Sequence, residues 1–258
     1  MVHVYSRHAR LAAAVAAVAL PVAAPAQEAP RTSSWGVGAM VVANESPYRD
    51  YKTDAIALPA LSYEGKRIYL RGATVGFRLY NTQASELSLI ASPLGFRFRG
   101  KDSDDARLRR LSDRDISGLA GVAWRYGDAE WGVVQASFQK ELTGHGGGTV
   151  ADASYAFPIR KGGMILTPRV GVTRNSAEMN NYYFGVDRGD ALKSGLPGYR
   201  AKGGNSPYVD LSLVQMLGRH WTVAAGFRYA ALPDTVADSP MVDKDSTSTI
   251  FGSVMYRF

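Results

Sequence analysis

The chain has 258 residues, a formal charge of +7, no cysteine, and a mean hydropathy of −0.15 although 46% of its residues are hydrophobic. The absence of cysteine excludes a disulfide framework and a thiolate metal site. A basic balance often accompanies nucleic-acid binding, but no basic helix or basic-aromatic motif is present, so we exclude a nucleic-acid partner.

The first 26 residues have the composition of an export signal. A basic start precedes an Ala, Val and Leu run over residues 11–20, and Ala24 and Ala26 form a small-x-small cleavage site. The run is too short to cross roughly 30 Å of hydrocarbon as a helix, so it is typical of a signal peptide. We therefore expect cleavage after Ala26 and export of one domain, residues 27–258.

The rest of the chain consists of segments of about ten residues in which apolar and polar side chains alternate, as in strands with one apolar face. The predicted strands are residues 34–43, 54–63, 66–81, 86–98, 114–126, 130–140, 149–159, 163–174, 207–217, 221–232 and 248–258. Short connectors at 127–129, 160–162 and 218–220 contrast with long polar ones at 99–113, 141–148, 175–206 and 233–247. In outer-membrane barrels the short turns face the periplasm and the long loops face outside.

This rule fixes the predicted strand number. Counting back from Phe258 places the connector at 82–85 in the periplasm, and counting forward from the N-terminus places the connector at 64–65 there too. Both cannot hold if residues 66–81 form one strand. We therefore split that stretch near Arg71 and Gly72. The result is an all-β fold: a transmembrane antiparallel up-and-down barrel, with twelve strands as the main prediction and ten as the alternative.

The last predicted strand supports the same class. Phe258, Tyr256 and Val254 occupy every second position, and Gly252 and Ile250 continue that face. A strand that closes on Phe with an aromatic residue two positions earlier resembles the signal read by the bacterial barrel-assembly machinery. The sequence therefore predicts a bacterial outer-membrane location, in contact with outer-membrane lipids and with lipopolysaccharide.

Several motifs carry a family resemblance. Trp35-Gly36-Val37-Gly38, the segment 47–51, the segment 59–72, and the tyrosine-rich segments 181–186 and 195–201 resemble, in order and spacing, the MipA/OmpV family of outer-membrane proteins. The match extends to Asp238-Ser239-Pro240 and so covers nearly the whole mature chain. Arg49-Asp50 departs from the Gly-Asp type turn of many members, so no function is drawn from that loop.

The resemblance implies a scaffold without catalysis or cofactor. The family takes its name from interaction with a murein lytic transglycosylase, and it is viewed as joining that hydrolase to a peptidoglycan synthase. The alternatives are a narrow porin-like channel for small solutes and an outer-membrane adhesin, and a lipid hydrolase is the least favoured reading. The periplasmic turns are short, which leaves little surface for a partner.

Four inward-facing arginines are candidate lumen residues. They are Arg71, Arg97, Arg169 and Arg228. In an open lumen they would favour anions. The alternative, which we favour, is that they meet carboxylates such as Asp152 and Asp210 in a closed, salt-bridged interior.

The long loops hold the other candidates. Tyr182, Tyr183 and Tyr199 are the candidate binding residues, because tyrosine rings can stack on sugars, although packing within the loop is the default. His145-Gly146-Gly147-Gly148 superficially matches a lipase oxyanion loop, but the chain has no G-x-S-x-G motif. We therefore expect no catalytic residue. The acidic run 102–105 lacks the Gly turn and distal Glu of a calcium loop, so we expect no metal site.

Overall fold

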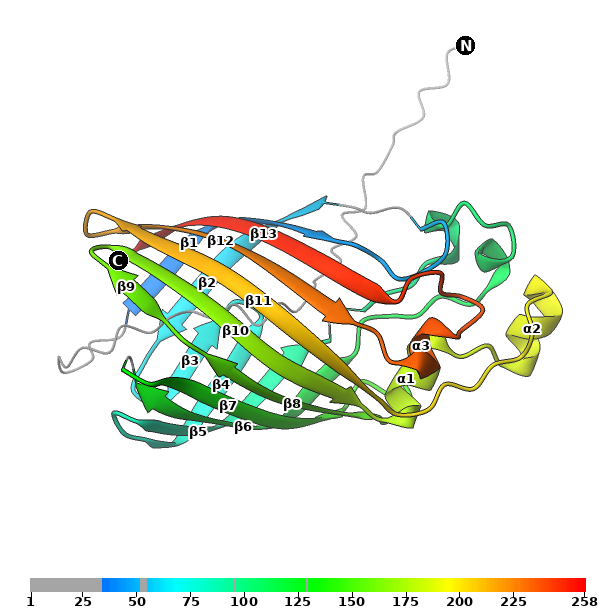
Figure 1. The fold of residues 1–258 in the computed structure, drawn as a ribbon, viewed down its shortest axis with the longest axis horizontal. Helices are drawn as coiled ribbons and strands as arrows, with labels where there is room; N and C mark the ends of the chain where they lie inside the picture. Colours follow the sequence, from blue (N-terminus) through cyan, green and yellow to red (C-terminus); the bar gives the residue numbers. More distant parts are fainter. Residues whose placement is uncertain (1–33, 52–54, 95, 129) are drawn as a thin grey trace, which may run out of the picture.

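A computed structural model describes residues 34–51, 55–94, 96–128 and 130–258 of the chain. The described strands form one closed antiparallel sheet, a twelve-stranded barrel with loops and short helices at one end (Figure 1). This confirms the predicted fold class and strand number. The predicted signal peptide, with Ala24 and Ala26, lies outside the described residues.

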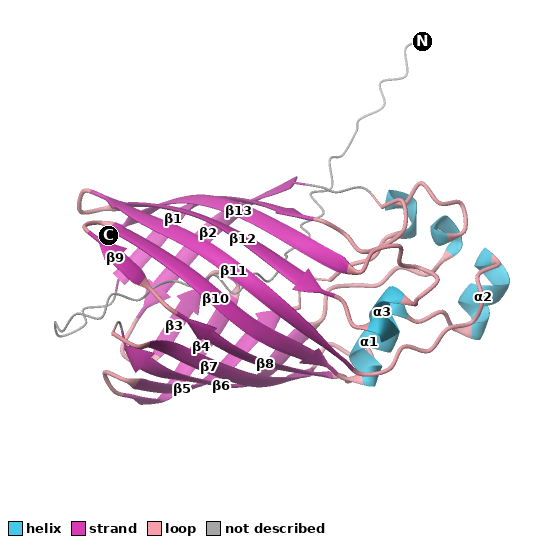
Figure 2. Ribbon diagram, in the orientation of Figure 1, coloured by secondary structure: helices cyan, strands magenta, loops and turns pink. Residues whose placement is uncertain are grey.

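The strands follow the chain in order around the barrel, and the helices lie in the loops at one end of it (Figure 2). The strands are β1 (Ser34–Asn44), β2 (Ala55–Glu64), β3 (Ile68–Arg71), β4 (Thr74–Asn81), β5 (Ser85–Pro93), β6 (Gly118–Asp128), β7 (Gly132–Glu141), β8 (Thr149–Ala156), β9 (Ile159–Lys161), β10 (Met164–Asn175), β11 (Gly204–Leu217), β12 (Trp221–Ala231) and β13 (Ser246–Arg257). The α-helices are α1 (Ala177–Phe184), α2 (Arg188–Ser194) and α3 (Asp234–Ala237), and the 3₁₀ helices are η1 (Gly100–Asp102) and η2 (Leu108–Arg110).

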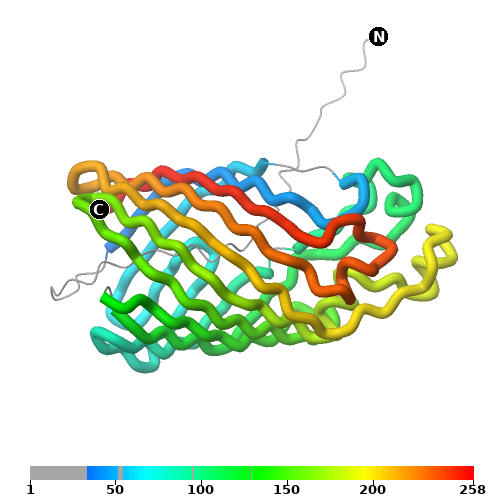
Figure 3. Tube along the Cα trace, viewed as in Figure 1, coloured from blue at the N-terminus to red at the C-terminus, as the bar shows by residue number. Residues whose placement is uncertain are grey.

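The barrel closes between its first and last strands. β1 pairs with β13 from Gly36 opposite Arg257 to Asn44 opposite Thr249, and the amide of Phe258 donates to the carbonyl of Trp35 at 3.0 Å. Neighbouring strands pair in order around the barrel, with the pairing of β2 and β3 limited to Ser62, Tyr63 and Glu64 of β2 (Figure 3). Closure matters because lipid cannot satisfy an open row of backbone N–H and C=O groups.

β8 and β9 together occupy one position in the barrel. Both pair with β10, β8 against its outer part and β9 against Met164, Ile165 and Leu166. The predicted single strand 149–159 is therefore interrupted. Pro158 lies in the break, and proline cannot donate to a strand ladder.

The predicted split of residues 66–81 is confirmed. β3 and β4 form a hairpin in which Arg71 lies opposite Thr74. Gly72 has a φ of 60°. It is the first central residue of a two-residue turn, a position at which glycine is the residue that adopts positive φ without strain.

The outward face of the strands is apolar, and aromatic side chains are concentrated at the end of the barrel that has the short turns. On β12, Trp221, Phe227 and Tyr229 point outward and are about half exposed. At the short-turn end, Trp35 packs on Tyr63 with ring centroids 4.5 Å apart, and Trp221 on Tyr256 at 5.2 Å. Other outward rings at this end are Tyr126, Trp131 and Phe258. Such a ring belt marks the boundary of a hydrocarbon layer.

Two strand boundaries differ from the prediction. β5 ends at Pro93 and β6 begins at Gly118, so residues 94, 96–98 and 114–117 belong to the loop between them. Pro93, the last residue of β5, has no N–H to donate to a strand ladder. Arg114 lies outside β6 because its guanidinium pairs with Asp190 of α2 at 2.7 Å.

The long loops fold together over the outer end of the barrel as a unit that we call the loop cap, whose described residues are 45–51, 96–117, 142–148, 176–203 and 232–245. Its core consists of buried apolar side chains from different loops. They include Tyr48, Phe98, Leu108, Met179, Tyr183, Phe184, Val236 and Met241. None of the described helices is long and apolar enough to cross a membrane.

Candidate functional site

The lumen contains a cavity of about 330 Å³. Its lining is mixed: Ile90, Leu94 and Val150 are apolar, whereas Gln135 and Gln139 are polar. Five arginines and only two carboxylates also line it, and these are Arg71, Arg125, Arg160, Arg169, Arg228, Glu86 and Asp152. The volume falls at the lower end of the range for small-ligand pockets.

One group of these charges is fully paired. Arg71 donates to Glu64 at 2.6 Å and to Glu86 at 3.1 Å, and Arg78 donates to the same two carboxylates at 2.5 and 2.7 Å. Tyr69 lies under both guanidinium groups. The network ties β2, β3, β4 and β5 together, so Arg71 has a structural partner on each side.

A second group is paired on the opposite part of the sheet. Arg228 donates to both oxygens of Asp210, at 2.6 and 3.1 Å, and lies over the ring of Tyr208. Asp152 accepts from Thr173 and from the hydroxyl of Tyr208. The structure therefore pairs Arg228 with Asp210, one of the two carboxylates named from the sequence.

A third group has no such partners. Among the described residues, no carboxylate forms an ion pair with Arg125, Arg160 or Arg169. Arg169 is only 8% exposed, and within the described chain its Nε has no hydrogen-bond partner. Arg125 is repelled by the charges of Arg71, Arg169 and Arg160 and attracted by that of Glu86. This cluster is an excess of positive charge inside the barrel.

The sequence analysis assigned one loop arginine to the lumen and left out two arginines that line the cavity. Arg97 lies in the loop after β5, where its guanidinium is 3.9 Å from Asp102. Arg125 and Arg160 line the cavity but were not selected. The signal for Arg125 was present, since it lies between the outward-facing Trp124 and Tyr126 of β6 and therefore points inward.

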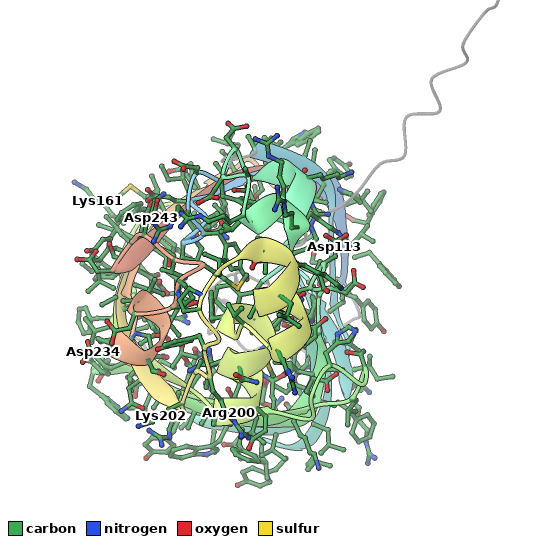
Figure 4. The ribbon with its side chains drawn as sticks, turned by 90° about the vertical axis from the view of Figure 1, so that its right-hand side faces the viewer. Asp113, Lys161, Arg200, Lys202, Asp234 and Asp243 are labelled. Atoms are coloured by element: carbon green, nitrogen blue, oxygen red, sulfur yellow. The ribbon has the colours of Figure 1, made fainter. Side chains whose placement is uncertain are left out.

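The loop cap covers the outer mouth. Seen from the loop end, α1 and α2 lie across the centre of the barrel opening (Figure 4). A hollow of about 620 Å³ lies in the cap, lined by Asp113, Arg114, Tyr182, Tyr199 and Arg200 among others. Figure 4 labels Asp113 and Arg200 at this end of the molecule.

The three candidate tyrosines separate into two environments. Tyr182 and Tyr199 both line the hollow. Tyr183 is 1% exposed, and its hydroxyl donates to Ser117 at 2.8 Å. Burial raises the pKa of Tyr183 to about 12, so its hydroxyl stays protonated and packs the cap.

A buried ion pair holds α2 in the cap. Arg114 is 2.7 Å from Asp190, which also accepts from the hydroxyl of Ser112. Burial alone would raise the pKa of Asp190, but the hydrogen bonds from Arg114 and Ser112 outweigh it and hold that pKa below its usual value.

Two backbone donors of the glycine loop after His145 are bonded to a carboxylate of the same loop. The amides of His145 and Gly147 both donate to the carboxylate of Glu141 at 3.0 Å. The ring of His145 stacks on Tyr182, and its Nδ1 lies 3.4 Å from the hydroxyl of Ser117, which is fully buried. An oxyanion site requires free donors beside an accessible nucleophile, and here two of the loop amides are bonded to Glu141 and the hydroxyl beside His145 is buried.

The periplasmic rim is basic. Lys66 and Arg67 lie in the β2–β3 turn, Lys161 ends β9, and Arg219 lies in the β11–β12 turn, all exposed. The exposed acidic residues of the described short turns are Asp128 and Glu130. Val254 and Tyr256, which belong to the predicted assembly signal, lie on β13 at the same end of the barrel.

The fold defines the class of protein. A closed antiparallel barrel with an apolar outer face, aromatic rings at one end, short turns there and long loops at the other is an outer-membrane β-barrel.

Comparison with known proteins gives the family. The sequence model described as MltA-interacting protein MipA matches residues 37–258, and the chain belongs to this family. It is 36% identical over 244 residues to the outer membrane protein YiaT of Escherichia coli, covering 95% of this chain and 97% of that one. It is 34% identical over 242 residues to the MltA-interacting protein of Escherichia coli, covering 94% and 97%.

A more distant relative is the outer membrane protein OmpV of Vibrio cholerae. It is 29% identical over 127 residues, 49% of each chain. These relatives are named as outer-membrane or interaction proteins. The protein is therefore an outer-membrane barrel of the MipA family, which confirms the resemblance and the predicted location.

Proposed function

We propose that this barrel is a non-catalytic docking platform that holds a murein lytic transglycosylase, and with it a peptidoglycan synthase, at the periplasmic face of the outer membrane. The name of a full-length relative, MltA-interacting protein, supports the first partner. The observation that carries the proposal is the basic periplasmic rim. An excess of exposed Lys and Arg attracts and orients an acidic surface patch on a partner.

The short turns limit the area of this interface. A standard interface buries about 800 Å² per partner, and no single turn supplies that. The rim as a whole is a ring of strand ends and turns, so a partner that spans several turns gains area from each. Charge complementarity then sets the orientation and the rate of association.

The test is binding of a purified lytic transglycosylase to the native barrel in nanodiscs, measured by biolayer interferometry at several salt concentrations. We expect a complex that weakens as salt rises. Reversing the four rim charges, with Lys66→Glu, Arg67→Glu, Lys161→Glu and Arg219→Glu, should weaken binding at least tenfold.

A matched control reverses four exposed charges at the outer end: Lys101→Glu, Arg110→Glu, Lys193→Glu and Arg200→Glu. It should bind as the native barrel does. Absence of any complex with the native barrel, together with no transglycosylase or synthase after crosslinking in intact cells, would remove the proposal.

A narrow channel is the second candidate function, favoured by the unpaired arginines in the lumen. Because the loop cap lies over the outer mouth, conduction along the barrel axis requires the cap to move. Planar-bilayer recordings should then show small steps with anion preference. Steps that favour cations, or none above background, would exclude this function.

A further inference from the structure

The barrel wall is interrupted beside β2. β3 pairs with β2 only at Ser62, Tyr63 and Glu64, so residues 55–61 have β1 on one side and no paired strand among the described residues on the other. Beyond the hairpin, β5 pairs with β4 only as far as Ala91. The short β3–β4 hairpin therefore leaves the outer parts of β2 and β5 with no described strand paired between them, and we call this unpaired part of the wall the wall window.

The register shows which backbone groups face the window. The amide of Phe258 donates to the carbonyl of Trp35, so odd-numbered residues of β1 direct their backbone groups towards β13 and even-numbered ones towards β2. Gly38 lies opposite Ala60. The odd-numbered residues of β2, including Ala57 and Pro59, therefore direct their backbone groups into the window.

Proline occurs on both sides of the window. Pro59 lies on the β2 side. On β5, Leu94 donates to the carbonyl of Ser117 on the β6 side, so Pro93 is directed towards the window. Proline has no N–H, and on a strand edge it prevents a further strand from pairing. The two prolines keep the window from being closed by another strand.

The window lies at the depth of the hydrocarbon layer. Tyr63 belongs to the ring belt at the short-turn end, and Ala55 is eight residues further along β2. Eight residues of a tilted strand rise roughly 20 Å, within an apolar band roughly 25 Å tall. Outward side chains near the window are apolar and exposed, among them Val37, Leu61 and Leu89.

The loop cap bounds the window on its outer side. The hydroxyl of Tyr51 accepts from the amide of Arg99 at 3.0 Å, and its ring lies 5.9 Å from that of Phe98. These contacts join the loop before β2 to the loop after β5. On its outer side, these contacts of Tyr51 separate the window from the outer mouth.

The lumen cavity reaches the frame of the window. Thr74 at the start of β4, together with Ile90, Pro93 and Leu94, lines the cavity. Irregular backbone at membrane depth is tolerated where it lines a cavity. The cavity is apolar near the window, whereas Arg125, Arg160 and Arg169 line its polar part.

The unpaired arginines indicate the ligand chemistry. A buried guanidinium without a partner is costly, and carboxylate or phosphate oxygens are its preferred partners. The Nε of Arg169 is a donor of this kind, since it is buried and has no hydrogen-bond partner within the described chain. A cavity of about 330 Å³ has room for one chain and not for a lipid with several.

We propose that the lumen cavity binds a single-chain amphiphile with an anionic head group, which enters from the membrane through the wall window. The head group pairs with Arg169 and Arg125, and the chain extends past Ile90 and Leu94 into the window. This site is separate from the periplasmic rim, so its failure leaves the docking proposal untouched.

The first experiment measures head-group binding to the full barrel in nanodiscs by isothermal titration calorimetry. The probes are laurate, dodecyl phosphate and inorganic phosphate. We expect both amphiphiles to bind, and Arg169→Met and Arg125→Met each to weaken them at least tenfold. Lys202→Met, which changes an exposed lysine outside the cavity lining, should have no effect.

Each variant is checked for the heat-modifiable mobility of a folded barrel, and the variant Arg169→Lys, which keeps the charge, should recover part of the affinity. Binding that is unchanged in both Met variants would overturn the proposal. Inorganic phosphate binding as tightly as dodecyl phosphate would also overturn it, because the site would then hold a free anion.

The second experiment locates the chain. A fatty acid with a photoreactive diazirine near its methyl end is crosslinked to the barrel in nanodiscs, and the modified peptides are mapped by mass spectrometry. We expect labels at Ala57, Pro59, Ala91 and Pro93, and loss of these labels in Arg169→Met. Equal labelling around the closed wall, for example at Val223 and Val254, would indicate annular lipid and overturn the window.

Discussion

The barrel wall and the loop cap bury opposite kinds of side chain. The wall exposes apolar residues such as Phe227 and holds ion pairs such as Arg228–Asp210 inside. The loop cap buries Phe98 and Met179 completely and places Arg99 and Asp115 at its surface. The physical reason is the surrounding solvent, because lipid surrounds the wall and water surrounds the cap.

The comparison predicts that the cap and the wall can be destabilised separately. The cap has its own apolar core and a buried ion pair, whereas the wall depends on strand pairing and tight inward contacts. Three substitutions test this, in decreasing order of the stability change that we expect.

Arg114→Met should destabilise the loop cap by about 3–5 kcal/mol, because it leaves Asp190 buried without its cation. Limited proteolysis should cut within residues 99–115 and 176–203 much faster than in the native protein. The wall should keep its heat-modifiable mobility. Simultaneous loss of the folded barrel would show that cap and wall unfold as one unit.

The double variant Arg114→Met with Asp190→Leu is the matched control. It removes both charges and should recover much of the lost stability. The ion pair also predicts that the loop cap loses stability at low pH. Since the pKa of Asp190 is lowered in the folded cap, its stabilising contribution is present above its ordinary pKa and is lost as pH falls through the lowered value. The double variant should not show this loss of stability at low pH.

Gly226→Ala should destabilise the wall by about 1–3 kcal/mol and leave the cap intact. A Cβ at Gly226 would lie 2.2 Å from the ring of Phe251 on the neighbouring strand. Thermal unfolding, followed by circular dichroism in detergent, measures the loss. Gly252→Ala is the control, because nothing lies within 4 Å of its Cβ position. Equal losses in both variants would refute the steric explanation.

Arg99→Ala should change the stability of the cap by less than about 1 kcal/mol. Arg99 is paired with Asp113 at 3.0 Å and with Asp115, but all three side chains reach solvent. Exposed ion pairs contribute little because water and salt screen them. Proteolysis of the cap at native rates is the expected result. A loss as large as that of Arg114→Met would contradict the distinction between surface and buried pairs.

Particular elements show why sequence reasoning succeeded for the wall. The alternation in Trp221, Val223, Ala225, Phe227 and Tyr229 specifies β12, because a strand has a side-chain period of two and lipid demands one apolar face. The connector rule placed the break near Gly72, where the hairpin turns. The strand 86–98 was predicted too long, because Phe98 packs in the core of the loop cap and does not face the lipid.

The pattern of the sequence was sufficient for the barrel class and for twelve strands as the main prediction, because these follow from local periodicity and turn length. The pairing of the inward arginines depends on the three-dimensional structure. Among the described residues, Arg71 and Arg228 have carboxylate partners from other strands, whereas no carboxylate forms an ion pair with Arg169 or Arg125. Partners across a sheet depend on register and closure, and neither is contained in the pattern of a single strand.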